Sequence, residues 1–287
     1  LVSSIDGVGT KLMVAAMMDK HDTVGHDIVN HCINDIAVQG AEPVYFMDYL
    51  GTGRLRSPQY EQILEGIADA CAAQNVSVLG GETAEMPGMY GDDYDLVGCI
   101  TGIVEESELI TGNLMEAGHV LIGLASNGLH TNGYSLARTV LFEESGYEVD
   151  TRLPELSGET VGDALLTPHT CYWPAIKAAL AADIPLHGMA HITGGGVLDN
   201  IPRVLPPGTA AVCRRNVLPV PPVLTLIQER GSISEQEMYH VFNMGIGMVW
   251  MVPAAAADTA LAVCGDNGFR AAVIGEIKTG DGNVALE

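Results

Sequence analysis

The sequence predicts an α+β fold with two domains: an N-terminal α+β domain and a C-terminal α/β domain built on a mixed sheet. The chain has 287 residues, of which 47% are hydrophobic and 17% charged, which suits two domains with filled cores. Strand-like and amphipathic helical runs follow one another in an order that mixes αβ and ββ steps. A small, polar run at 111–118, TGNLMEAG, interrupts this order, so we expect domains at 1–110 and 111–287.

In the first domain, apolar spacing defines each element in turn. Strand-like runs lie at 2–5, 44–50, 76–79 and 96–104. Helical spacing predicts helices at 11–18 and 27–38, the second with a continuous apolar arc. A third helix is expected to begin at Ser57 and Pro58, as N-cap and first-turn residue. This order predicts a sheet layer covered by helices and argues against a regular doubly wound fold.

The second domain repeats the alternation with longer connections. Strands are expected at 120–125, at 246–252 and near 271–277. Helices are expected at 134–144, 173–182, 222–230 and 254–264. A glycine-rich turn at 194–196 lies between them and interrupts both kinds of spacing.

Charge and hydropathy exclude several classes of function. The 13 Lys and Arg residues stand against 36 Asp and Glu residues, a formal net charge of −23, which argues against binding a nucleic-acid backbone or an anionic membrane. No apolar run approaches the roughly 20 residues of a membrane helix, and the start lacks the pattern of a secretory signal. We expect a cytoplasmic protein that binds small molecules. Because Leu1 opens directly into a strand, we also expect residues upstream of it.

Two glycine-containing segments with carboxylates follow predicted strands. DGVGTK at 6–11 opens a helix, and GGETAE at 80–85 comes after the strand at 76–79. Glycines let the backbone approach a ligand, and a helix N-terminus offers N–H groups to an anion. With Asp35 and Asp95, the two segments could supply oxygen ligands for Mg²⁺ held against a polyphosphate. The alternative is that both are turn glycines next to incidental acids.

Two carboxylates lie within apolar patterns. Asp48 belongs to the run at 44–50, whose faces are both largely apolar, so it is either a buried functional carboxylate or a strand-end residue that caps the next turn. Asp35 belongs to the polar arc of the helix at 27–38. Such an arc is usually a solvated surface, although Asp35 lies at its edge, where it would face a cleft.

Two histidines follow predicted strands in loops of small residues. His130 lies in SNGLHTNGYS at 126–135, and His191 begins HITGGG at 191–196. Loops after strands are common places for accessible catalytic groups, and a histidine there can exchange protons near neutral pH. His191 could instead cap the turn that follows it. No GxSxG segment is present, so acyl transfer by a serine nucleophile has no support.

Six segments together resemble one known family. They are SSIDGVGTKL, INDIAVQGAEPVYFMDY, LGGETAEMPGMY, SNGLHTNGYSL, HITGGGVLDNIPRVLP and EMYHVFNMGIGM. In this order they are similar to phosphoribosylformylglycinamidine cyclo-ligase, also called AIR synthetase, of purine biosynthesis. The resemblance implies a ferredoxin-like N-terminal domain whose strands join a partner's in a barrel, and therefore a homodimer. It also implies ATP and Mg²⁺ as requirements and formylglycinamidine ribonucleotide as the substrate.

The resemblance also implies roles for individual residues. Catalytic roles fall to His130 as the acid or base, to Lys11, which would neutralise phosphate charge, and to His191. The metal ligands would be Asp6, Asp35, Glu82 and Asp95. The ATP and substrate site would be lined by Thr10, Asn34, Asp48, Gly80, Gly81, Thr83, Asn132, Ser135, Gly194 and Gly195.

Two alternatives stay open at this point. One is another ATP-using enzyme of the same superfamily, such as formylglycinamidine synthetase, selenophosphate synthetase, thiamine-phosphate kinase or a hydrogenase-maturation factor. The other is a nucleotide-binding dimer without catalysis, because the family carries a glycine-rich segment upstream of the position where this sequence begins.

Overall fold

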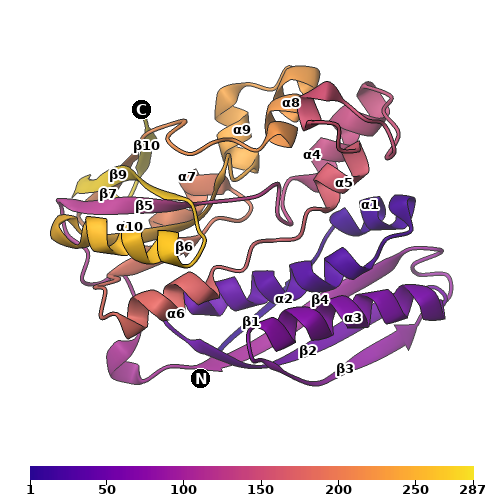
Figure 1. Ribbon diagram of the computed structural model, residues 1–287, viewed down its shortest axis with the longest axis horizontal. Coiled ribbons are helices and arrows are strands. Elements are labelled where there is room, and N and C mark those ends of the chain that lie inside the picture. The colour runs from indigo at the N-terminus through magenta and orange to yellow at the C-terminus, as the bar shows by residue number, and fades with distance from the viewer.

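The computed structural model describes residues 1–287 and contains two mixed sheets, which confirms the predicted α+β class (Figure 1). The N-terminal sheet has the strand order β1 (Val2–Gly7), β4 (Tyr94–Ile103), β2 (Glu42–Thr52) and β3 (Ser77–Glu85). The helices of this domain are α1 (Lys11–Met18), α2 (Asp22–Ala37) and α3 (Ser57–Ala73), followed by the 3-10 turn η1 (Glu106–Glu108).

The C-terminal sheet has the strand order β10 (Val284–Leu286), β7 (Thr209–Cys213), β9 (Ala271–Thr279), β5 (His119–Ala125), β8 (Ile246–Pro253) and β6 (Gly188–His191). Its α-helices are α4 (Tyr134–Arg138), α5 (Val161–Leu166), α6 (Trp173–Ala181), α7 (Gly196–Asn200), α8 (Pro222–Gly231), α9 (Glu235–Val241) and α10 (Ala257–Asp266). Shorter pieces are the π-helix η2 (Thr139–Glu144) and the 3-10 turns η3 (Pro154–Leu156), η4 (Ile201–Val204) and η5 (Ala254–Ala256). Helix α10 contacts β5 and β9, whereas η4 contacts β6 and β7.

Strand β2 lies inside the N-terminal sheet, as its apolar run predicts. It is antiparallel to β4 and parallel to β3, with α3 as the crossover. Helices α2 and α3 lie along one side of this sheet (Figure 1), and α2 packs against β4 and β2. Phe46, Leu96 and Ile100, on these two strands, are fully buried. The other side is open: Ile5, which pairs with Cys99 next to Ile100, is 70% exposed.

The polar arc of α2 is not the solvated surface that its composition favours. Asp27 and Asn34 are 0% exposed, because the arc packs against the C-terminal domain. The Asn34 amide donates to the carbonyl oxygen of Thr170 and accepts the backbone N–H of Tyr172. These polar residues therefore form part of the contact between the two domains.

Other differences from the predicted elements have local causes. GGETAE is not a loop, because residues 80–85 continue β3 and pair in parallel with β2. The helix expected at 134–144 is α4 followed by η2, and Arg56 rather than Ser57 precedes α3, without a side-chain cap. The short elements α5, β6, α7, β7, α9 and β10 were not predicted; β6, for example, is buried along its whole length and shows no alternation. None of the helices combines the length and the hydropathy that a membrane span requires.

Candidate functional site

A cleft of about 450 Å³ lies between the two domains and contains three of the predicted site residues. Its walls come from β1 and α2 on the N-terminal side and from β6, α7 and η4 on the C-terminal side. Asp6 lies on β1, Asp35 on α2, and His191 at the end of β6. The packing of the two domains therefore brings together side chains that are far apart in the sequence.

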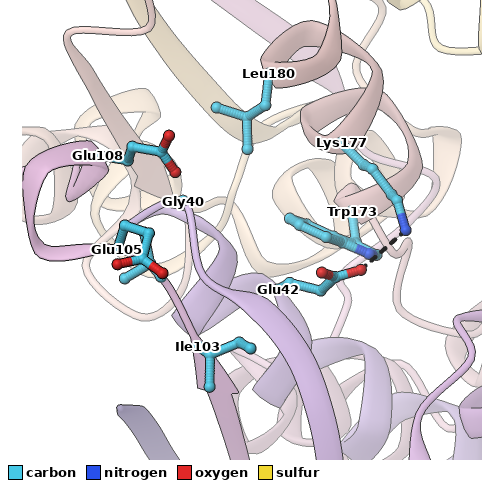
Figure 2. A pocket seen from close by; sticks show the side chains of 9 residues that line it. Gly40, Glu42, Ile103, Glu105, Glu108, Trp173, Lys177 and Leu180 are labelled. Atoms are coloured by element: carbon cyan, nitrogen blue, oxygen red, sulfur yellow. Dashed lines mark hydrogen bonds and ion pairs between the residues drawn. The ribbon is translucent and has the colours of Figure 1, made fainter.

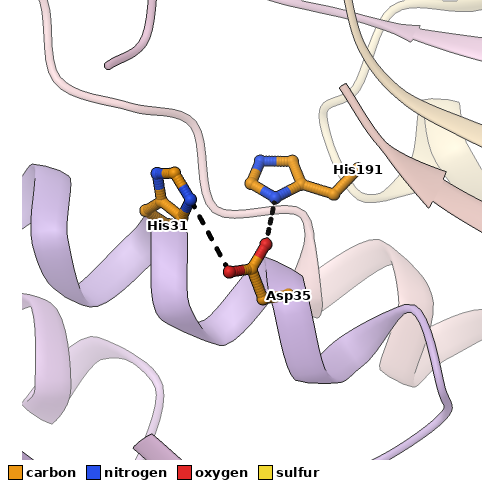
Figure 3. A group of neighbouring side chains, drawn as sticks. All are labelled: His31, Asp35 and His191. Carbon is orange, nitrogen blue, oxygen red and sulfur yellow. Dashed lines mark hydrogen bonds and ion pairs between the residues drawn. The ribbon is translucent and has the colours of Figure 1, made fainter. Parts of the chain in front are cut away.

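Asp35 is the centre of a hydrogen-bonded cluster in this cleft (Figure 3). Its carboxylate is 2.8 Å from His191 Nδ1 and accepts a hydrogen bond from Ser4 Oγ at 2.9 Å. His31 Nε2 lies 3.6 Å from the same carboxylate, and Figure 3 shows both imidazole rings beside it, one from α2 and one from β6. Burial alone would raise the pKa of Asp35, but the contacts with His191 and His31 outweigh it and hold the pKa below its ordinary value.

His31 lies between two carboxylates. Its Nε2 is 3.0 Å from Asp6 Oδ2, and its Nδ1 is 2.8 Å from Thr131 Oγ1. Burial opposes a charge on this imidazole, yet the hydrogen bond to Asp6 and the charges of Asp35 and Asp6 raise its pKa. The pKa of Asp6 is lowered, because its hydrogen bond to His31 outweighs its partial burial. The cleft therefore holds a strongly polar group of two acids and two imidazoles.

A second layer of histidines lies behind the first. His169 Nε2 is 2.9 Å from His191 Nε2, and His169 Nδ1 is 3.3 Å from Thr131 Oγ1. The ring of His130 stacks on that of His169, with 4.1 Å between the ring centroids. Burial, with the nearby imidazoles and Lys11, lowers the pKa of both His130 and His169 well below the ordinary value. Both rings are therefore neutral near pH 7.

The structure places His130 behind this cleft, and its role as the acid or base stays a prediction. Its side chain does not line the cleft, the residue is 1% exposed, and neither ring nitrogen has a hydrogen-bond partner. The loop after β5 turns inward, and the carbonyl oxygen of His130 accepts a hydrogen bond from Lys11. Lys11 also donates to the carbonyl oxygen of Thr167, which follows α5. His130 therefore packs behind the cluster, against the ring of His169.

Lys11, predicted to neutralise phosphate charge, is buried in this structure, and that role stays a prediction. Lys11 is 0% exposed, and its Nζ lies 2.8 Å from the carboxylate of Asp27. The same ammonium donates to the carbonyl oxygens of His130 and Thr167. Its three donors are occupied, so Lys11 forms a structural ion pair that joins α1, α2 and the C-terminal domain.

The four predicted metal ligands do not meet in one site. Asp6 faces α2, where it contacts His31. Glu82 and Asp95 face the opposite side of the N-terminal sheet, because their strand neighbours Gly81 and Leu96 face the helices. Among the four, only Asp6 and Asp35 share the cleft.

The predicted nucleotide-binding residues fall into separate places. Thr10 Oγ1, in the N-terminal domain, lies 3.3 Å from Ser135 Oγ in the C-terminal domain. Gly194 lies next to Asn132, because a Cβ built on this glycine would be 3.4 Å from Asn132 Oδ1. The side chain of Asn34 is hydrogen-bonded to the backbone of Thr170 and Tyr172 in the contact between the domains.

The remaining predicted residues lie apart from the cleft. The half-buried Asp48, whose pKa burial raises, touches the backbone of Gly81 so closely that a Cβ there would collide with it. Thr83 Oγ1 is 3.2 Å from the hydroxyl of Tyr60. Gly80 has open space around it, and Gly195 has a φ of 92°, which favours glycine.

Three residues of the cluster were missed by the sequence analysis: His31, Thr131 and His169. A signal for His31 was present, because it is four residues before Asp35 on one helix face. His169 carries no comparable signal. Its place beside His191 depends on the path of residues 167–172 over α2, which only the fold defines.

A second hollow of about 340 Å³ lies where α6 meets the ends of β2 and β4 (Figure 2). Lys177 Nζ pairs with Glu42 at 3.0 Å and lies near the ring of Trp173, and Figure 2 shows Glu105 and Glu108 across the hollow from them. None of the predicted site residues lines it. The cleft at Asp35 is therefore the candidate site.

Comparisons with known proteins identify both domains. Residues 1–104 match the family model described as "AIR synthase related protein, N-terminal domain", and residues 116–286 match the model of the C-terminal domain of the same family. In Bifidobacterium longum, a protein named phosphoribosylformylglycinamidine cyclo-ligase is 49% identical over 278 residues, which cover 96% of this chain and 80% of that protein. The protein of the same name in Thermoanaerobacter pseudethanolicus is 50% identical over 287 residues, 100% of this chain and 84% of that protein.

Solved structures share the fold at low identity. The hydrogenase maturation protein HypE of E. coli superposes with a TM-score of 0.68 at 20% identity, over 92% of this chain and 76% of that one. A thiamine-monophosphate kinase of Stenotrophomonas maltophilia superposes with a TM-score of 0.70 at 17% identity, over 100% of this chain and 84% of that one. These likenesses establish the architecture alone. Since both family models match and relatives share about half of their residues over nearly the full chain, the protein belongs to the phosphoribosylformylglycinamidine cyclo-ligase family of AIR synthase related proteins.

Proposed function

We propose that this protein catalyses the ATP-dependent ring closure of 5′-phosphoribosylformylglycinamidine to 5-aminoimidazole ribonucleotide, with release of ADP and phosphate, in purine biosynthesis. The observation that carries this function is the match, at 49–50% identity over at least 96% of the chain, to proteins named for this reaction. The protein is accordingly a ligase that forms a C–N bond by closing a ring.

ATP is needed because an amide oxygen is a poor leaving group. Transfer of the γ-phosphoryl group to this oxygen gives an iminophosphate, the amidine nitrogen attacks its carbon, and phosphate leaves while a proton is lost. Phosphoryl transfer requires mainly positioning and neutralisation of charge. A hydrogenase maturation protein of the same fold is known in complex with ATP, which supports a nucleotide site in this architecture.

The cleft suits a substrate that carries a phosphate at one end. Arg203, on η4, is the only Lys or Arg side chain that lines it, and guanidinium groups bind phosphate through paired hydrogen bonds. In a chain with a net charge of −23, such a cation also offsets repulsion of the anionic substrate. We place the 5′-phosphate at Arg203 and the reacting end of the substrate near Asp35.

The Asp35 cluster does not suit a resident Mg²⁺ ion. Mg²⁺ prefers oxygen ligands in octahedral geometry, whereas Asp6 and Asp35 share their site with the ring nitrogens of His31 and His191. Magnesium therefore enters this proposal as part of the substrate, the MgATP complex. Glu82 and Asp95, on the far side of the N-terminal sheet, stay candidates for contact with that complex.

We also place a homodimer contact on the open side of the N-terminal sheet. Ile5, Leu79 and Ile103 are 51–70% exposed on its strands, and exposed apolar patches on a sheet are typical of association surfaces. A partner there would face Glu82 and Asp95. Sedimentation velocity tests this directly, and a monomer at micromolar concentration would contradict it.

The reaction is tested by incubating the protein with MgATP, with and without the formylglycinamidine ribonucleotide. We expect ADP and aminoimidazole ribonucleotide in equal amounts, both dependent on the ribonucleotide. ADP release that does not depend on this substrate, or no product at all, would contradict the proposed function.

The substitution Arg203→Ala tests the placement of the substrate. Loss of a phosphate contact should raise KM for the ribonucleotide by about 10-fold or more, since hydrogen bonds to charged groups contribute about 1.5–3 kcal/mol, and should leave KM for ATP unchanged. The matched control is Arg214→Ala, which removes an exposed arginine outside the cleft. An equal rise of both KM values would place Arg203 elsewhere than at the ribonucleotide phosphate.

A further inference from the structure

Asp6, His31, Asp35 and His191 combine carboxylate and imidazole donors, a combination that the MgATP requirement does not explain. We propose that His31, Asp35 and His191, with Asp6 as a fourth ligand, bind a divalent transition-metal ion of the zinc type (Zn²⁺, Co²⁺ or a similar ion). The donor atoms of the first three residues all lie within 4.8 Å of one another. They come from two domains, so an ion there would also bridge the domains.

The spacing of the donors matches a coordination shell. Metal–ligand bonds of 2.0–2.1 Å give neighbouring ligand atoms separated by about 2.9 Å in an octahedron and about 3.3 Å in a tetrahedron. The corresponding separations here are 2.8 Å for His191 Nδ1 to Asp35, 3.0 Å for His31 Nε2 to Asp6, and 3.6 Å for His31 Nε2 to Asp35. His31, Asp35 and His191 can therefore surround one ion with small shifts, whereas Asp6, which contacts His31 and is outside the group of donors within 4.8 Å of one another, has to move closer to become the fourth ligand.

Outer contacts orient each ligand, as in known metal sites. The second nitrogen of His31 contacts Thr131 Oγ1 at 2.8 Å, and that of His191 contacts His169 Nε2 at 2.9 Å. Ser4 Oγ donates to Asp35, and Asp6 accepts a backbone N–H. If the outer nitrogens of His31 and His191 carry the protons, both lone pairs point toward the carboxylates, as metal binding requires.

Charge and donor type select the ion. The two carboxylates carry a charge of −2 and the two neutral imidazoles carry none, so a divalent cation makes the cluster neutral. Without an ion, the cluster keeps a negative charge unless an imidazole such as that of His31 is protonated. Imidazole nitrogen favours Zn²⁺, Co²⁺ and related ions over Mg²⁺. The cleft, about 450 Å³ in volume, gives the ion a path to the site.

The test is titration of the chelator-treated protein with Co²⁺, without ATP or ribonucleotide, so that its result is independent of the cyclisation assay. We expect one Co²⁺ per chain, with visible absorption typical of nitrogen and oxygen ligands and displaced by Zn²⁺ but not by excess Mg²⁺. His31→Gln and His191→Gln should abolish this spectrum. Thr131→Val, which removes an outer contact, should weaken binding by roughly 10- to 100-fold.

His240→Ala is the matched control. His240 is 55% exposed and lies 3.8 Å from Asp199, another histidine–aspartate pair outside the cleft, so this variant should bind Co²⁺ like the unmodified protein. Circular dichroism of each variant shows whether it is folded, and added Zn²⁺ should raise the melting temperature of the unmodified protein and of His240→Ala, but not that of His31→Gln or His191→Gln. The absence of Co²⁺ binding, unchanged binding in folded His31→Gln, or displacement by Mg²⁺ would overturn the proposal and leave a metal-free ion-pair cluster.

Discussion

At the scale of single residues, burial decides what a charged side chain does. Lys11 follows a glycine-containing segment at the start of a helix, a pattern typical of phosphate binding, yet its ammonium is buried with Asp27. Arg203 has no such pattern and lines the cleft. Sequence spacing identifies residue types that are able to bind a phosphate, whereas packing determines which of them reaches solvent.

The substitution Lys11→Met tests the structural role of this ion pair. It leaves the carboxylate of Asp27 buried without its partner, so the free energy of unfolding should fall by about 3–5 kcal/mol. Lys177→Met is the control, because the Lys177–Glu42 pair has a similar N···O distance, 3.0 Å against 2.8 Å, but is more than half exposed, and its loss should cost less than about 1 kcal/mol. Urea denaturation measures both; equal losses would show that burial of Lys11 adds nothing to the pair.

At the scale of elements, amphipathic helices and long strands were predictable, and short buried ones were not. Helix α1 matches its predicted bounds, and β2 was predicted as an interior strand from its apolar faces. The four-residue strand β6 is buried throughout, so it has no alternation to detect. Because His191 ends β6 and His31 lies on the buried polar arc of α2, half of the candidate site depends on contacts that sequence periodicity does not encode.

Helices α2 and α3 approach each other through glycine, and this contact can be tested. A Cβ on Gly66 would collide with the backbone of Asp22, and one on Gly25 would lie 2.7 Å from the nitrogen of Ile67. Gly66→Ala should therefore push the helices apart and lower the free energy of unfolding by about 1–3 kcal/mol. Gly265→Ala in α10, where nothing lies within 4 Å, should instead raise it by roughly 0.5–1 kcal/mol. Denaturant unfolding checks both signs, and a stabilised Gly66→Ala would refute the close packing.

At the scale of the whole molecule, the surface and the domain contact have opposite electrostatic character. The chain carries a net charge of −23, whereas the contact between the domains encloses His130 and His169 as neutral rings. Folding places these imidazoles where a proton is unfavourable. Stability and domain packing are therefore linked to pH through two buried histidines that do not line the cleft.

This linkage predicts loss of stability on acidification. In the unfolded chain His130 and His169 titrate near their ordinary pKa of 6.5, but in the folded protein burial keeps both neutral at lower pH. Below about pH 6.5 the unfolded state therefore binds more protons, and each such histidine lowers the free energy of unfolding by up to about 1.4 kcal/mol per pH unit. His31, whose pKa is raised, acts in the opposite sense, since its stabilisation is present below pH 6.5 and is lost as pH rises through its folded pKa.

Urea denaturation of the chelator-treated protein between about pH 7 and pH 5 should show the decline in the free energy of unfolding. In His130→Asn, which keeps a residue that tolerates the positive φ of this position, the decline should be shallower; an unchanged slope would mean that His130 titrates alike in both states.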